Sequence, residues 1–95
     1  MPKTNLTDDT ALISKVFRTV KSPQAVSDLL KDLLTEEEII DLAQRLKIAK
    51  LIISGKNYDE ISKSVDTSTA TISKIGQAIK YGNHGFTKVF KAKSK

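Results

Sequence analysis

The segment from Ile39 to Ile53 is apolar on almost every side of the helix that it predicts. Its apolar residues are too many for the single stripe that a surface helix of a globular protein presents to its core. A helix that is apolar nearly all round must be surrounded by other helices. This requirement constrains the fold more than any other feature of the sequence.

The rest of the 95-residue chain supplies only short helices to surround this segment. A chain of this length also buries a smaller share of its surface than a larger protein does. We therefore expect a second copy of the chain to cover the remainder. A central helix enclosed within a monomer is the alternative. The expectation is one domain, residues 1–95, that forms a homodimer.

Two amphipathic helices are predicted before this segment. Apolar residues at helical spacing predict the first over residues 8–20. Ser22 followed by Pro23 is typical of an N-cap and the first helical position, so a second helix begins there. Thr35 and the glutamate three residues later have the spacing of a capping box, which marks the start of the long helix. Residues 1–54 are thus predicted to be the dimerisation helices.

A short helix, a break and a second helix follow Gly55, which is expected to end the long helix as a left-handed cap. Asn57 and the glutamate three residues later repeat the capping spacing. The break is predicted at residues 66–68, and the second helix runs to Tyr81, with glycines at 82 and 85 ending it. This layout predicts a helix-turn-helix over residues 57–81.

Each helix of this pair has an apolar face that is expected to point inward. On the first helix that face is Tyr58, Ile61 and Val65, and on the second it is Ile72, Ile75, Gly76 and Ile79. No segment predicts a strand, so an all-α fold is expected. A further turn of helix is expected in the tail, residues 86–95, through Phe86, Val89 and Phe90.

The opposite face of the second helix is rich in small and hydroxylated side chains. Such residues let a helix approach base edges in the major groove, where hydroxyls donate or accept hydrogen bonds and methyl groups touch thymine. Basic and amide groups further along the helix can serve phosphates or guanine edges. Any helical hairpin with a polar second helix would look similar, and that alternative remains open. The residues concerned are Ser68, Thr69, Ala70, Thr71 and Ser73, followed by Lys74, Gln77 and Lys80.

Charge is unevenly distributed along the chain. Residues 1–45 carry six Lys or Arg against eight Asp or Glu, whereas residues 46–95 carry ten against three, which gives net charges of −2 and +7. A basic half is what attraction to a polyanion requires, although lysine-rich solvated surface is the simpler alternative. The basic tail is compatible with binding to double-stranded DNA. It is equally compatible with the competing function, a helical homodimeric adaptor that docks on RNA or an acidic protein.

The sequence predicts no enzyme, no metal site and no cofactor. The chain lacks cysteine, which excludes disulfides and thiolate metal sites. His84 has no neighbours suited to a metal site or a nucleophile–base pair. Helix capping accounts for the acidic group Glu36–Asp41. A polar N-terminus, together with the lack of a run of about 20 apolar residues, predicts a soluble cytoplasmic protein with no membrane partner.

Several stretches of the chain resemble the Trp repressor superfamily. The run Ile79–Phe86 is similar to the YerC/YecD branch rather than to the tryptophan-sensing repressors. The resemblance implies a Trp-repressor-like helical bundle and an intertwined homodimer, whose N-terminal helices wrap the partner and whose reading helices enter successive major grooves. It also implies a transcriptional repressor. The stretches are Leu34–Glu38, Gln44–Ile48, Ile53–Gly55 and Ser68–Lys74.

The resemblance also implies, by matching positions in the family, which residues read the bases and which lie near an effector. The base-reading positions fall on Thr67, Ser68, Thr69, Ala70, Thr71 and Ser73, beside Lys74 and Gln77.

The tryptophan pocket of the family carries over less completely. Thr35 and Arg45 match family positions near the ligand. The family's arginine that stacks on the ligand corresponds to Lys74 in this chain. The glycine that leaves room for the indole corresponds to Ile75, and the serine that contacts the ligand's amino group corresponds to Ala78. Lysine lacks a planar guanidinium, and a branched isoleucine fills space that the ring needs. We therefore expect no tryptophan corepressor, and the effector is unknown.

Overall fold

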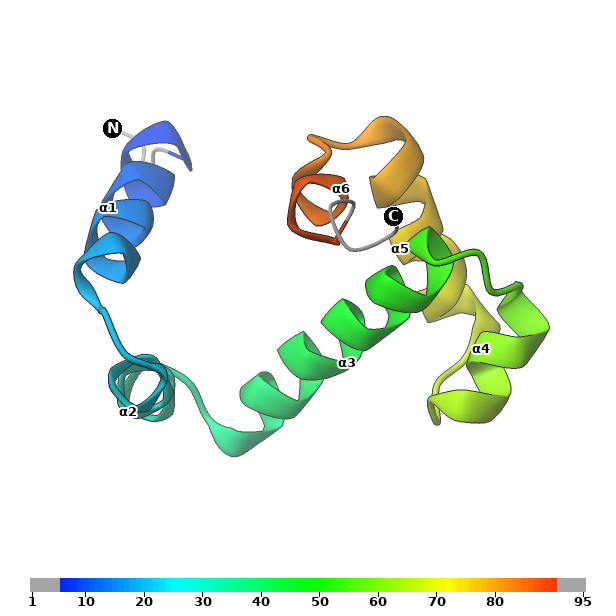
Figure 1. The fold of residues 1–95 in the computed structure, drawn as a ribbon, viewed down its shortest axis with the longest axis horizontal. Helices are drawn as coiled ribbons and strands as arrows, with labels where there is room; N and C mark the ends of the chain where they lie inside the picture. The colour runs from blue at the N-terminus through cyan, green and yellow to red at the C-terminus, as the bar shows by residue number, and fades with distance from the viewer. Residues whose placement is uncertain (1–5, 91–95) are drawn as a thin grey trace. The chain divides into compact units, whose positions relative to one another are not determined.

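The computed structural model describes residues 6–90 of the chain, and it is built from helices and the turns that join them (Figure 1). No strand occurs among residues 6–90, so the all-α prediction is confirmed. None of the helices within this range is both long enough and apolar enough to cross a membrane. The helices are α1 (Leu6–Thr19), α2 (Pro23–Leu33), α3 (Glu36–Ile53), α4 (Tyr58–Ser64), α5 (Thr69–Tyr81) and α6 (Gly85–Phe90).

The chain divides into two compact units, Met1–Ile39 and Ile40–Lys95. The boundary between them falls within α3. The first unit holds α1, α2 and the first turn of α3, and the second unit holds the rest of α3 with α4, α5 and α6.

Local hydrogen bonds set the helix starts in the first unit. The Ser22 hydroxyl accepts the Ala25 N–H at 3.1 Å, and Pro23 occupies the first helical position. The Thr35 hydroxyl accepts the Glu38 N–H at 3.1 Å, while the Glu38 carboxylate accepts the Thr35 N–H at 2.9 Å. Both predicted caps are thus confirmed, because each depends only on residues within one helical turn.

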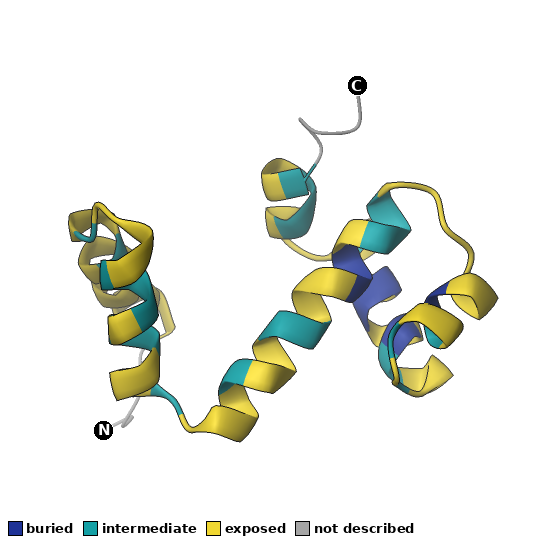
Figure 2. Cartoon of the chain, turned by 60° about the horizontal axis from the view of Figure 1, so that its bottom comes forward, coloured by how far each residue is buried: buried dark blue, intermediate teal, exposed yellow. Residues whose placement is uncertain are grey.

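The first unit has no enclosed core. None of its described residues is buried, and Figure 2 shows its helices only in the exposed and intermediate colours. Leu6 is 80% exposed, Leu12 62% and Leu33 58%. Leu33 of α2 and several apolar residues of α1 are therefore exposed in a single chain, whereas Leu29 and Leu30 of α2 are half-buried.

The buried core lies in the second unit, where α4 and α5 meet the C-terminal part of α3 (Figures 1 and 2). Ile48, Ala49, Ile61 and Ile72 are fully enclosed, and Ile75 is only 6% exposed. This small core holds both helices of the predicted helix-turn-helix on α3. The half-buried apolar residues packed around it are Leu51, Ile52, Val65, Ile79, Phe86 and Phe90.

The earlier part of α3 in this unit is much less covered. Ile40 is 65% exposed, Leu42 43% and Leu46 47%. The described part of one chain therefore does not enclose the helix that is apolar nearly all round.

The last two helices are joined differently from the sequence prediction. Gly82 caps the end of α5 as expected, but Gly85 begins α6 and does not end α5, so the prediction was wrong for this glycine. His84 takes the left-handed conformation in the turn, with φ of 62°, and its carbonyl accepts the Lys88 N–H at 3.0 Å. The predicted turn of helix in the tail is confirmed as α6, and residues 91–95 lie outside the described range.

Candidate nucleic-acid interface

A tight turn directs the chain from α3 into α4. Gly55 has φ of +101°, its N–H bonds to the Ile52 carbonyl at 3.0 Å, and the Lys56 N–H bonds to the Leu51 carbonyl at 3.0 Å. These two bonds form a Schellman motif, which confirms the predicted left-handed cap. The chain then enters α4, the first helix of the predicted helix-turn-helix.

The start of α4 is fixed by a reciprocal capping box. The Asn57 side chain accepts the Glu60 N–H at 2.8 Å, and the Glu60 carboxylate accepts the Asn57 N–H at 3.0 Å. Both predicted partners are therefore present. The negative charge of Glu60 in the first turn also suits the positive end of the helix.

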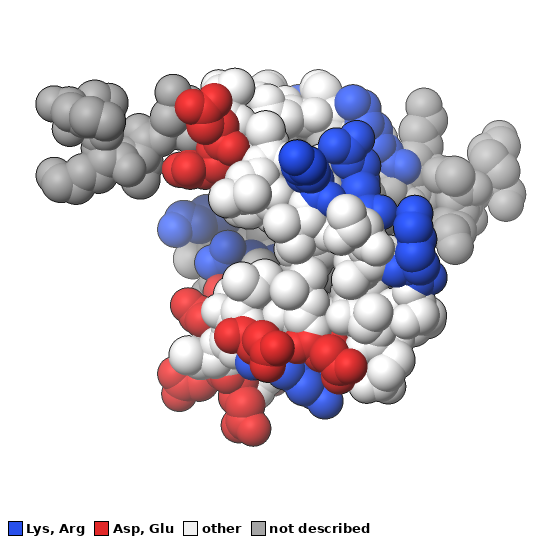
Figure 3. Space-filling model, turned by 90° about the vertical axis from the view of Figure 1, so that its left-hand side faces the viewer, with Lys and Arg blue, Asp and Glu red and all other residues white. Residues whose placement is uncertain are grey.

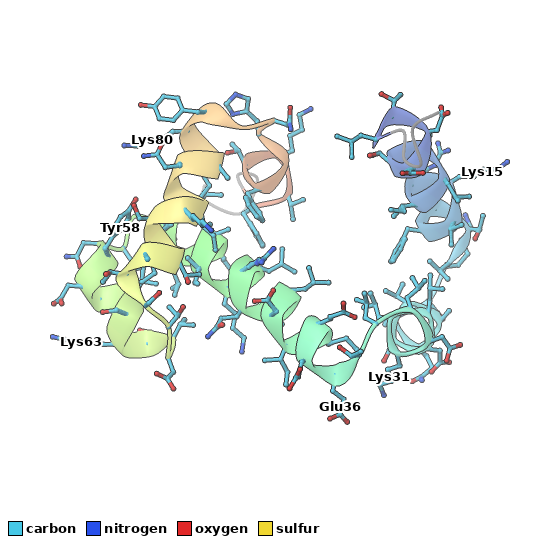
Figure 4. The ribbon with its side chains drawn as sticks, turned by 180° about the vertical axis from the view of Figure 1, so that it is seen from behind. Lys15, Lys31, Glu36, Tyr58, Lys63 and Lys80 are labelled. Atoms are coloured by element: carbon cyan, nitrogen blue, oxygen red, sulfur yellow. The ribbon has the colours of Figure 1, made fainter. Side chains whose placement is uncertain are left out.

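Tyr58 packs where α4 approaches α5 (Figure 4). Gly76 is buried, and a Cβ atom added to it would overlap the Tyr58 hydroxyl oxygen and lie 3.2 Å from the ring carbon Cζ. Tyr58 is 40% exposed, so the predicted inward face of α4 is fully buried only at Ile61. The two helices come together closely because position 76 has no side chain.

The N-terminal end of α5 is capped by one of the candidate hydroxyls, that of Ser68. The Ser68 hydroxyl accepts the Thr71 N–H at 3.2 Å and lies 3.1 Å from the Thr71 hydroxyl. Thr71 and Thr67 are half-buried, whereas Ser68 is exposed. In the free protein, then, the Ser68 and Thr71 hydroxyls are engaged with each other in starting the helix.

The remaining candidates lie on the exposed side of α5. Ile72, Ile75 and Gly76 form the buried side of the same helix, as the sequence predicted, with Ile79 half-buried. The helix therefore presents a small, polar surface from a fixed apolar base. The exposed candidates are Thr69, Ala70, Ser73, Lys74 and Gln77.

The helices α4 and α5 carry the exposed lysines Lys63, Lys74 and Lys80. Lys63 on α4 pairs with Asp59 at 3.4 Å, but both side chains are more than three-quarters exposed, so solvent weakens the pair. Lys63 and Lys80 extend outward from α4 and α5 (Figure 4). On the face shown in Figure 3, which is the left-hand side of Figure 1, Lys and Arg side chains gather into groups, as do Asp and Glu side chains. Exposed lysines of this kind are suited to phosphate contacts.

The residues at the family's effector positions have different local surroundings. Ile75 belongs to the core, and Arg45 pairs with Asp41 at 3.0 Å on the exposed side of α3. Lys74 is exposed on α5, and Thr35 caps α3 in the first unit. Ala78 lines a hollow of about 510 Å³ among α3, α5 and α6. The other residues that line it are Leu46, Gly82, Asn83, His84, Gly85, Phe86 and Val89.

One contact at this site had no counterpart in the sequence analysis. The Gln44 side-chain amide donates to the backbone carbonyl of Asp66 at 2.9 Å. The two residues are 22 positions apart, so no local pattern points to the pair. Within residues 6–90 no group of three or more His, Asp or Glu side chains is arranged to hold a metal ion.

Comparisons with known proteins identify the family of this chain. A model of the Trp repressor protein family matches residues 8–94. The chain belongs to the Trp repressor family. The uncharacterised protein YerC of Bacillus subtilis (strain 168) is 32% identical over 77 residues, which make up 78% of this chain and 74% of YerC. The resemblance seen in the sequence, including that to the YerC-like branch, is confirmed.

Solved structures share the fold as well. A TrpR-like protein from Eubacterium eligens ATCC 27750 has a TM-score of 0.83 and 30% identity, over 95% of this chain and 90% of that one. A candidate Trp repressor from Staphylococcus aureus has a TM-score of 0.81 and 29% identity, over 95% of this chain and 88% of that one. The family is a DNA-binding regulatory fold and not an enzyme family.

Proposed function

We propose that this chain is a sequence-specific, double-stranded DNA-binding transcriptional regulator that acts as a repressor. The observation that carries the proposal is the exposed side of α5, which presents small polar residues from a buried isoleucine base. Membership of the Trp repressor family supports it. In this proposal α5 is the reading helix of a helix-turn-helix and enters the major groove.

The side chains on α5 suit distinct contacts with DNA. Thr69, Ala70 and Ser73 are short enough to let the helix approach the base edges, and their methyl and hydroxyl groups match thymine methyls and polar base atoms. Gln77 has the donor and acceptor pair that recognises adenine. Lys74 can reach a phosphate or a guanine edge. Thr67, Ser68 and Thr71 stay in the proposed reading surface at the start of the helix.

We further propose that the functional form is a homodimer. The uncovered leucines of α1 and α2 and the exposed part of α3 together offer the apolar surface that a second copy would cover. Among residues 6–90 the buried apolar core comprises five residues, which is small for a stable domain and favours burial between chains. Two copies of α5 related by a twofold axis would read an inverted repeat with half-sites about 34 Å apart, or a small multiple of that distance.

The proposed regulator does not respond to tryptophan. Ile75 occupies the position of the glycine that leaves room for the indole, and its side chain is 6% exposed within the core. Lys74 lacks the flat guanidinium that would stack on the ring. The proposal includes no metal, no cofactor and no catalytic role, and it places the protein in the cytoplasm with the DNA.

The decisive experiment is selection of bound duplexes from a random DNA pool at about 0.15 M salt, where non-specific phosphate attraction is weakened. Recovery of an inverted repeat is the expected result. With that operator, Thr69→Asn should change the preferred base in each half-site. Its control Lys88→Ala should weaken binding to all sequences alike and reduce the salt slope by about 1.

The competing function predicts a different outcome. An adaptor that docks on RNA or an acidic protein through its basic half would yield only weak, salt-sensitive duplex binding and no enriched sequence. Thr69→Asn would then not change the preferred base, and its effect on DNA affinity would not differ in kind from that of Lys88→Ala. That combination would overturn the proposal.

A further inference from the structure

The turn between α4 and α5 is held by a side chain that is not part of the helix-turn-helix. Gln44 lies on α3, is half-buried, and donates its amide N–H to the Asp66 carbonyl at 2.9 Å. Asp66 stands two positions before Ser68, the N-cap of α5. The bond therefore ties α3 to the backbone that leads directly into the exposed first turn of α5.

Packing around this bond is loose. A hollow of about 280 Å³ lies beside it, between α3 and the end of α4, and the turn residues are only half-buried or exposed. The nearest fully enclosed anchors are Ile61 before the turn and Ile72 after it. Between these anchors the Gln44 amide supplies a directional contact that loose apolar packing does not. The residues that line the hollow are Ile40, Ala43, Gln44, Lys47, Ser64, Val65 and Asp66.

We propose that Gln44 is a positioning residue for DNA recognition: it holds the turn so that the N-terminal end of α5 meets the base edges at the correct angle. This inference rests on the proposed function. Base contacts depend on placement to within a fraction of an ångström and carry the sequence information, whereas phosphate contacts carry none directly. Loss of the bond should therefore reduce sequence-specific binding and leave non-specific binding unchanged.

Two substitutions remove the bond in different ways. Gln44→Met keeps the size of the side chain but has no donor, and Gln44→Asn keeps the amide but is one methylene too short to reach. Gln24→Met is the matched control. The Gln24 amide also donates at 2.9 Å, but to the exposed Asp28 carboxylate one turn along the same helix.

Dissociation constants are measured for the full chain on the selected operator and on a scrambled duplex at the same salt. Both Gln44 variants should lose about three- to tenfold in operator affinity, the usual effect of one hydrogen bond, with no change on the scrambled duplex. Amide hydrogen exchange at residues 65–68, measured without DNA, should be faster in both variants. Gln24→Met should match the wild type in every measurement.

Unchanged operator affinity in both Gln44 variants would overturn the inference. An equal loss on both duplexes, accompanied by a lower melting temperature, would also overturn it, since that is general destabilisation. A wild-type protein that binds both duplexes equally would instead refute the proposed function. In that case unchanged amide exchange at the turn would independently refute the positioning contact.

Discussion

Replacing Gly76 by alanine tests the close approach of α4 and α5. The added Cβ would overlap the Tyr58 hydroxyl oxygen and lie 3.2 Å from Cζ, so the tyrosine ring must move. Tyr58 is 40% exposed and can swing toward solvent, but it then loses its packing on α5. The substitution therefore gains stability from the higher helix propensity of alanine and loses stability from the displaced tyrosine ring.

The two effects have opposite signs and similar size. Alanine in place of glycine inside a helix is worth about 1 kcal/mol in stability. Overpacking of this kind costs about 1–2 kcal/mol. Gly76→Ala in the wild-type chain should thus be neutral or lower the free energy of unfolding by up to about 1 kcal/mol. In a Tyr58→Ala background the same change should raise it by about 1 kcal/mol.

A double-mutant cycle measures this reversal. Urea unfolding of the four proteins at one fixed concentration gives a coupling energy, which we expect to be about 1–2 kcal/mol. The Tyr58→Phe background should give an intermediate value, because it removes the hydroxyl oxygen but leaves Cζ in place. If Gly76→Ala stabilises the wild type as much as the Tyr58→Ala protein, the proposed packing is refuted.

Two more predictions concern the helix caps and the exposed apolar surface. Asn57→Ala should destabilise the protein by about 1 kcal/mol in thermal unfolding, because it removes the acceptor of the Glu60 N–H, whereas Asn57→Ser should retain most of the stability. Equal melting of all three proteins would contradict the cap. Leu46→Lys puts a charge on the exposed part of α3 and should convert the proposed homodimer to monomers in sedimentation, while Lys50→Gln should not. A dimeric Leu46→Lys protein would contradict the proposed interface.

The features that could be predicted from the sequence are those that depend on neighbouring residues. The caps at Ser22, Thr35 and Asn57 each join a side chain to a backbone group three residues away, so the pattern alone identifies them. The buried faces of α4 and α5 follow from helical spacing for the same reason. His84 shows the limit of this reasoning, because its left-handed conformation lets the chain begin α6 one residue earlier than the apolar pattern indicates.

The contacts that position the candidate site depend on where helices cross. Gln44 reaches Asp66 and Tyr58 meets Gly76 only because α3, α4 and α5 pack in one particular arrangement. Periodicity specifies which side of a helix is apolar, but it does not specify which residue on a second helix will face it. These pairs therefore appear only when the helices are seen together.

The exposed part of α3 follows from the sequence in a different way. A helix that is apolar nearly all round requires neighbours on every side, and the described part of one chain covers only its C-terminal half. Ile40 and Leu46 stay exposed, whereas Ile61 and Ile72 are buried in the core against the C-terminal part of α3. The core that holds the proposed reading helix thus leaves the part of α3 that carries Ile40 and Leu46 exposed. We propose that a second copy of the chain binds to this exposed surface.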